Sequence, residues 1–135
     1  MLKRILIIDD DQSICDVIAQ AYEDNFITLA ASGRDNIFTL IEDFKPDVVL
    51  IEYRLYMQNG AKLCSMIKLN PETTRLPVIL LSTNAPNEDI KNSFCNTFVS
   101  KPFDLWELES VIDSYCNWSV WIETHVPPPM NCLLL

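Results

Sequence analysis

The chain has 135 residues with a formal net charge of −9, and 49% of its residues are hydrophobic. This composition is typical of a globular protein with one core and excludes a disordered chain. The negative charge argues against nucleic acid or an anionic membrane surface as a partner. No apolar run approaches the length of about 20 residues that spans a bilayer.

The cysteines and the single histidine give no sign of a metal-binding framework. The five cysteines include no Cys-x-x-Cys pair, and His125 lies far from the acidic clusters. We therefore expect neither a zinc site nor a disulfide framework. The odd number of cysteines fits a reducing compartment, and the N-terminus lacks a signal-peptide cleavage site. The predicted location is cytoplasmic.

The apolar pattern predicts strands and helices that alternate along the chain. In chain order, the predicted elements are a strand over Arg4–Ile8, a helix over Ile14–Ala21, a strand over Phe26–Ala31, a helix over Ile37–Phe44, a strand over Val48–Glu52, a loop over Tyr53–Gly60, a helix from Gly60 through Ile67, a strand over Pro77–Leu81, a short helix over Glu88–Phe94, a strand over Thr97–Ser100 and a helix over Leu105–Tyr115. Such alternation with short loops predicts an α/β fold of three layers, in which a doubly wound, five-stranded parallel sheet lies between helices.

Informative polar residues follow the predicted strands. Asp9 and Asp10 follow the first strand, Glu52 closes the third, Ser82 follows the fourth and Lys101 follows the fifth. Since the carboxyl ends of parallel strands point the same way, these side chains are expected to converge on one rim. Clustered carboxylates repel one another unless a cation lies between them, and oxygen ligands on an open rim suit Mg²⁺. A lysine and a hydroxyl opposite them would bind a carboxylate or a phosphoryl oxygen.

At this point the sequence resembles the receiver domain of two-component response regulators, over roughly residues 3–118. The stretches that carry the resemblance, in order, are Ile7–Asp10, Pro46–Ile51, Asn59–Gly60, Asn70–Glu72, Leu76–Ser82 and Lys101–Phe103. The resemblance implies a flavodoxin-like fold with strand order 2-1-3-4-5. It also implies a signalling protein rather than an enzyme, with a site at the strand ends. The implied residues are Glu52, Ser82 and Lys101 for phosphoryl chemistry, Ser82 and Phe98 for switching, and Asp9, Asp10, Glu52 and the backbone carbonyl of Arg54 for Mg²⁺.

Glu52 is the main departure from the family pattern, which has an aspartate as phosphoacceptor at this position. The extra methylene moves the carboxylate outward by roughly one carbon–carbon bond, to about where a phosphoryl group would sit. Because in-line phosphoryl transfer depends on positioning, attack by Glu52 should be strongly impaired. The displaced carboxylate is then free to bind Lys101 as a permanent charge mimic. Two alternatives stay open, namely loss of signalling through this pocket and residual phosphotransfer.

The predicted function is an atypical receiver, or pseudo-receiver, that signals by protein–protein interaction independently of phosphorylation on Asp. The alternative is a residual Mg²⁺-dependent phosphoacceptor that takes phosphate from a histidine kinase. The expected partners are proteins of two-component signalling, such as a histidine kinase or an output protein, with no nucleic acid and no membrane.

The last part of the chain suggests further contacts. Residues 1–122 are predicted to form the receiver, and residues 123–135 an extended tail, because Pro127–Pro129 cannot continue a helix. A homodimer through the face from the fourth to the fifth helix is expected, and Trp106 on the last helix is a candidate anchor for it. The segment between Ser82 and Lys101 is a few residues shorter than the family pattern, which places a deletion in the fourth helix or the loop before it.

Overall fold

The structure is a computed structural model that describes residues 2–83, 86–116 and 133–134. Its strands are β1 (Lys3–Ile8), β2 (Phe26–Ala31), β3 (Val48–Glu52), β4 (Arg54–Leu55), β5 (Gln58–Asn59), β6 (Val78–Ser82), β7 (Thr97–Ser100) and β8 (Leu133–Leu134). Its helices are α1 (Gln12–Ala21), α2 (Ile37–Phe44), α3 (Gly60–Leu69), α4 (Glu88–Lys91) and α5 (Leu105–Cys116). None of these helices is long and apolar enough to cross a membrane.

The main sheet has the predicted topology. Its strand order is β2-β1-β3-β6-β7-β8, and all of its pairs are parallel. The first five strands of this order are the predicted 2-1-3-4-5 arrangement, so the α/β doubly wound fold is confirmed. The central strand β3 is buried along its whole length, as its continuous apolar run predicts.

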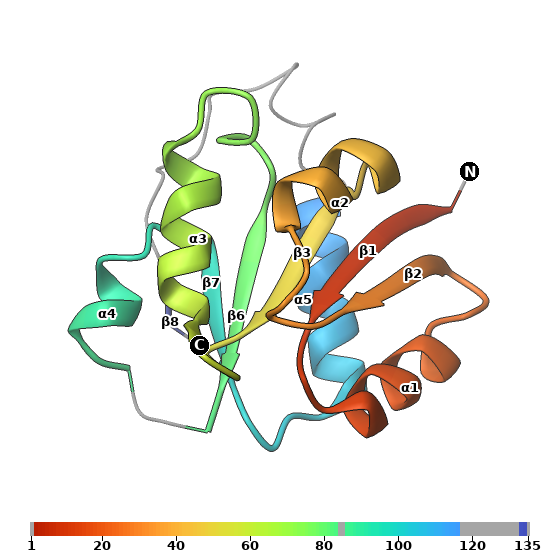
Figure 1. The fold of residues 1–135 in the computed structure, drawn as a ribbon. Helices are drawn as coiled ribbons and strands as arrows, with labels where there is room; N and C mark the ends of the chain where they lie inside the picture. Colours follow the sequence, from red (N-terminus) through yellow and green to blue (C-terminus); the bar gives the residue numbers. More distant parts are fainter. Residues whose placement is uncertain (1, 84–85, 117–132, 135) are drawn as a thin grey trace.

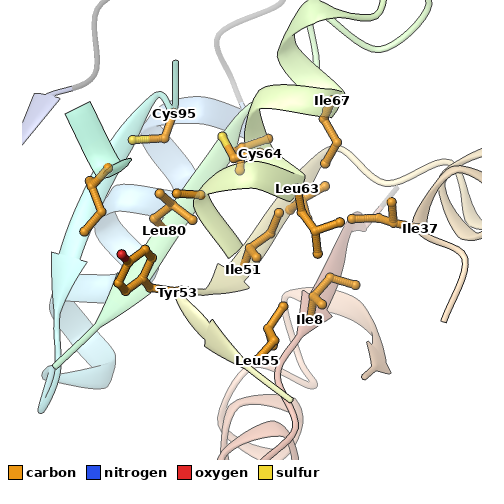
Figure 2. Packing of buried hydrophobic residues seen from close by; sticks show 14 of the residues in the cluster. Ile8, Ile37, Ile51, Tyr53, Leu55, Leu63, Cys64, Ile67, Leu80 and Cys95 are labelled. Carbon is orange, nitrogen blue, oxygen red and sulfur yellow. The ribbon is translucent and has the colours of Figure 1, made fainter. Parts of the chain in front are cut away.

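Helices cover both faces of the sheet, which makes three layers (Figure 1). Alternate residues of each strand point to opposite faces, so neighbours such as Leu50 and Ile51 belong to different apolar clusters. Ile51 packs with residues of α2, α3 and α4, and Figure 2 shows it beneath Leu63 of α3. Leu50 packs with residues of α1 and α5. This two-sided core fixes the strand ends that carry the polar residues.

Three elements differ from the prediction. The loop after β3 contains a two-stranded antiparallel hairpin of β4 and β5. Helix α4 has a single turn and ends at Lys91 instead of Phe94, which agrees with the deletion inferred for this region. Strand β8 pairs with β7 opposite Thr97 and Phe98 and was not predicted. The rest of the predicted tail lies outside the described residues.

The cysteines depart in part from the expectation. Cys15, Cys64 and Cys116 are free and buried, where they act as small apolar side chains. Cys95, in contrast, is disulfide-bonded. The cysteine spacing predicted no disulfide framework, and it gave no indication of this one disulfide-bonded cysteine. Cys132 lies outside the described residues.

Lys68 is a buried cation on α3 at the end of the sheet opposite the polar rim. Its ammonium donates hydrogen bonds to the carbonyl oxygen of Leu76 at 3.0 Å and to Oδ1 of Asn96 at 2.9 Å. Both acceptors are neutral, and burial lowers the pKa of Lys68 below its ordinary value. The side chain therefore joins α3 to the loops before β6 and β7 at an electrostatic cost.

We expect Lys68→Met to change how stability depends on pH. Because the pKa of Lys68 is lowered in the folded state, the folded protein binds fewer protons than the unfolded chain between the lowered pKa and the ordinary value of about 10.4. The free energy of unfolding should therefore rise with pH through that interval. Urea unfolding from neutral pH upward measures this rise, which Lys68→Met should lack. Parallel curves for the two proteins would contradict the prediction.

Candidate functional site

The polar residues predicted to converge do so at the carboxyl edge of the sheet. Glu52 is the last residue of β3 and pairs in register with Leu81 of β6, next to Ser82. Asp9 follows β1, and Lys101 follows β7, where its N–H donates to the carbonyl of Ser82 at 2.8 Å. Adjacent parallel strands thus end side by side and bring one basic, one hydroxyl and two acidic residues to one rim.

Lys101 connects two of the carboxylates. Its Nζ lies 3.1 Å from Oδ2 of Asp9 and 3.0 Å from Oε2 of Glu52. The side chains of Lys101, Asp9 and Glu52 are only 11%, 4% and 11% exposed, so the three charges are largely removed from water. The contact between Glu52 and Lys101 is the one that the longer side chain of Glu52 predicts.

Burial shifts the pKa values of both partners in this contact. Burial raises the pKa of the Glu52 carboxyl, and the ammonium of Lys101 offsets this only in part. Burial alone would lower the pKa of Lys101, but Glu52 and Asp9 outweigh it and hold the pKa above its ordinary value. Oε2 of Glu52 accepts no hydrogen bond from the described residues, so its contact with Lys101 is a charge attraction without a well-directed hydrogen bond. The contact holds the carboxylate of Glu52 next to the ammonium of Lys101 in a partly desolvated position.

The acid pair predicted to hold Mg²⁺ is engaged elsewhere. Asp9 accepts from the N–H of Asp11 at 2.9 Å and from Lys101. Asp10 accepts from the N–H of Gly33 at 2.9 Å and, through its other oxygen, from the N–H of Tyr56. The described residues also contain no group of three or more acidic, histidine or cysteine side chains placed to share an ion. Because Mg²⁺ needs several free oxygen ligands, this arrangement does not fit a Mg²⁺ site.

The hairpin of β4 and β5 is closed against the loop after β2. Tyr56 donates to Asp10, and Nε2 of Gln58 donates to the carbonyl of Gly33. Leu55 is buried against Gly33, where an added Cβ would lie 2.9 Å from Cβ of Leu55. The loop that borders the site is thus held by contacts among three segments that are separate in the sequence, those of Asp10, Gly33 and the hairpin. No sequence signal indicated this closure, because the hairpin residues lack a strong turn pair such as Asn-Gly at the turn.

The remaining predicted residues lie around the same edge. Ser82 is buried at the end of β6, and Arg54 lies in β4 with its side chain exposed. Phe98 is 0% exposed and packs in the same apolar cluster as Ile51, so it lies in the core. The peptide bond Lys101–Pro102 is cis. The roles assigned to these residues stay predictions.

A polar cluster that the sequence did not suggest links the site to α4. Oη of Tyr53, the residue after Glu52, donates to Oδ2 of Asp89 at 3.0 Å. Nδ2 of Asn59 also donates to Asp89, at 3.3 Å, and Nδ2 of Asn87 donates to Oη of Tyr53 at 3.2 Å. The end of β3 and the start of α3 are therefore bonded to α4. The tyrosine after a buried strand was the only available clue, since a buried Tyr needs a partner for its hydroxyl.

The comparisons with known proteins agree with this fold. A model of the response regulator receiver domain matches residues 5–113. The chain belongs to the response regulator receiver domain family. Receiver domains act in two-component signalling with histidine kinases and output domains, commonly bind Mg²⁺ at the phosphorylation site and are generally not catalytic.

Curated relatives and solved structures support this assignment. The regulatory protein AtoC of Escherichia coli (strain K12) is 33% identical over 115 residues, which cover 82% of this chain and 24% of that protein. The phosphate regulon transcriptional regulatory protein PhoB of Pseudomonas aeruginosa is 29% identical over 137 residues, covering 98% of this chain and 60% of that protein. A CheY-like receiver domain protein from Methanospirillum hungatei JF-1 has a TM-score of 0.76 at 25% identity, over 87% of this chain and 95% of that one. This receiver domain thus spans 24% to 60% of the length of these two curated relatives.

Proposed function

We propose that this receiver domain is a pseudo-receiver, which signals through protein–protein contact without being phosphorylated at the position of Glu52. The contact of Glu52 with Lys101 at 3.0 Å is the observation that carries the proposal. A negatively charged oxygen already occupies the position next to the lysine that would otherwise bind an incoming phosphoryl group. The charge that phosphorylation adds in other receivers is in this way a fixed part of the side chain.

The hydrogen bonds of the acid pair support the same proposal. Phosphoryl transfer in this family uses Mg²⁺, whereas Asp10 is bound to two backbone N–H groups and Asp9 to Asp11 and Lys101. The alternative, a residual Mg²⁺-dependent phosphoacceptor that receives phosphate from a histidine kinase, requires these bonds to break before the metal binds. It is the alternative that the following experiment distinguishes.

The experiment is phosphoryl uptake measured by intact-protein mass spectrometry, with a small acyl-phosphate donor and Mg²⁺. Wild type is compared with Glu52→Asp, which restores the acceptor of the family and shortens the side chain by one methylene. We expect wild type to gain no phosphoryl group. Uptake by Glu52→Asp alone would show that Glu52 is the cause of the lost phosphoryl transfer. If neither protein takes up a phosphoryl group, the closed hairpin and the hydrogen-bonded acid pair also contribute to the loss.

A wild-type protein that gains one phosphoryl group would overturn the proposal and favour the alternative. To exclude labelling elsewhere on the chain, the modified residue is identified by peptide mapping. Glu52→Gln serves as the matched control, because an amide has nearly the same size and cannot form the acyl phosphate. Uptake that persists in Glu52→Gln therefore does not come from Glu52.

The proposal also covers the partners of this receiver domain and its location in the cell. The contacts are with proteins of two-component signalling in the cytoplasm, and residues 1–122 form the signalling unit, followed by the tail at 123–135. A homodimer through α4 and α5 is part of the proposal, since Trp106 on α5 is 77% exposed and an exposed Trp is a frequent interface anchor. If light scattering shows only monomer at high protein concentration, the homodimer is no longer part of the proposed function.

A further inference from the structure

The hairpin and α3 form an apolar groove that the proposed phosphorylation-independent site does not use. We call it the methionine groove. It has a volume of about 470 Å³ and is lined by Met57, Gln58, Asn59, Lys62, Leu63 and Met66. Met57 is 86% exposed and Met66 47% exposed, while Leu63 is buried between them and the core. A cavity of this size accepts one or two side chains of a bound segment.

Methionine side chains suit such a surface. They are unbranched and polarisable, so they adapt to apolar partners of different shape, and they are frequent on peptide-binding surfaces. Met57 is held out from the hairpin by a backbone with a φ of 60°, a conformation that residues with a side chain seldom adopt. The hairpin is itself fixed by the bonds of Tyr56 and Gln58 to Asp10 and Gly33. The exposed side chain is therefore carried on a constrained turn.

The charge around the groove is opposite in sign to that of the whole chain. Lys62 is the only charged residue that lines the groove in the described structure. A second cavity of about 400 Å³ shares Gln58 and Asn59 with it, and its only charged lining residue is Arg54. The guanidinium of Arg34 lies 4.4 Å from the ring centre of Tyr56 at the hairpin turn. The chain has 19 acidic and 10 basic Lys and Arg residues, so cations gather here on an otherwise acidic protein.

Two acids of the described structure are bonded to this region, and both are already engaged. Asp10 accepts hydrogen bonds from the N–H groups of Gly33 and Tyr56. Asp89 accepts hydrogen bonds from Tyr53 and Asn59, and these donors stabilise the negative charge of its carboxylate. The exposed cations Lys62 and Arg54 therefore set the sign of the potential that an approaching partner meets.

We propose that the methionine groove binds an amphipathic segment of a partner protein, in which an apolar side chain is flanked by carboxylates. The apolar side chain lies between Met57 and Met66, and the carboxylates face Lys62 and Arg54. This inference rests on the proposed function for its use in signalling, because it names a surface through which a receiver locked by Glu52 makes its contact. The groove includes no residue of α4 or α5, so it is separate from the face predicted to form the homodimer.

Selection of short random peptides displayed against the full chain tests the proposal. A selected peptide is synthesised and added to protein labelled with ¹³C at the methionine methyl groups, and binding is followed by NMR. The sequence has four methionines, and the signals of Met57 and Met66 are assigned from Met57→Leu and Met66→Leu. We expect selected peptides with an apolar residue flanked by Asp or Glu, and we expect the signals of both Met57 and Met66 to shift as the peptide is added.

Two charge variants on the same helix make the test specific. Lys62→Glu should weaken the binding of the peptide by about tenfold or more, and the fold is retained because an acid in the first turn of α3 favours the helix dipole. Leu69→Glu is the matched control, since Leu69 is exposed on α3 and does not line the groove. Its affinity for the peptide should stay within about twofold of wild type.

Several outcomes would overturn the proposal. These are selected peptides without acidic residues, binding that Lys62→Glu leaves unchanged, or binding that leaves both methionine signals in place. Shifts of the same signals with protein concentration alone would assign the groove to a second copy of the chain and equally overturn it. None of these outcomes depends on phosphoryl uptake, so this inference and the proposed function fail separately.

Discussion

Lys101→Met is expected to lower the free energy of unfolding by about 3 kcal/mol or more at neutral pH. Lys101 is the cation within 3.1 Å of both Asp9 and Glu52, and all three side chains are at most 11% exposed. Without the ammonium, two carboxylates face each other in a poorly solvated site. Removing one partner of a buried ion pair costs more than the pair itself contributes, because the remaining charge stays desolvated. Urea unfolding monitored by circular dichroism measures the loss.

A double variant separates this electrostatic effect from lost packing. In Lys101→Met with Glu52→Gln, one of the two uncompensated charges is gone, so we expect a large part of the stability to return. Lys91→Met, on the exposed surface of α4, is the control for replacing a lysine and should change stability by less than about 0.5 kcal/mol. If the double variant is as unstable as Lys101→Met alone, the loss comes from packing and the charge explanation is wrong.

Gly60→Ala should be the second severe change, with a loss of more than about 2 kcal/mol. A Cβ at this position would lie 2.1 Å from the carbonyl oxygen of Glu52 and 2.9 Å from Cα of Tyr53. Both are backbone atoms, and the N–H of Gly60 is bonded to the carbonyl of Tyr53 at 2.7 Å, so a small side-chain movement does not relieve the clash. The start of α3 or the end of β3 must shift. The midpoint of urea unfolding reports the loss.

Lys62→Ala is the matched control for Gly60→Ala, since it changes an exposed residue in the same first turn of α3. Its midpoint should stay close to that of wild type. Because the clash involves the residue at the centre of the site, Gly60→Ala should also move the backbone amide NMR signals of Glu52 and Tyr53. A stable Gly60→Ala protein with unchanged signals at both positions would show that the backbone adjusts there at little cost.

The sheet could be predicted from the sequence because its central strands β3 and β6 are buried on both faces. A strand such as Val48–Glu52 is one apolar run that ends at a polar residue. This pattern can be recognised in the sequence without knowing which strands lie beside it. The convergence of Asp9, Glu52 and Lys101 followed from the parallel alternation of strands and helices. The contact of Glu52 with Lys101 followed from the length of one side chain.

The features that were not predicted depend on partners distant in the sequence. The closed hairpin depends on bonds from Tyr56 and Gln58 to Asp10 and Gly33, which local propensity does not encode. The burial of Lys68 depends on acceptors at Leu76 and Asn96 that only the fold brings near. A lysine in a helix ordinarily indicates a solvated surface, so nothing in the local pattern distinguished this one.

Asp10 has a structural role in the fold that is independent of metal binding. Its carboxylate bonds the N–H groups of Gly33 and Tyr56 and so ties the loop after β2 to the hairpin after β3. The fold therefore uses the acid at this position whether or not a metal binds there. The presence of the acid pair in this sequence is therefore not by itself evidence of metal binding, because one of its two acids also connects two loops. The identity of the hydrogen donors around the pair is the better criterion.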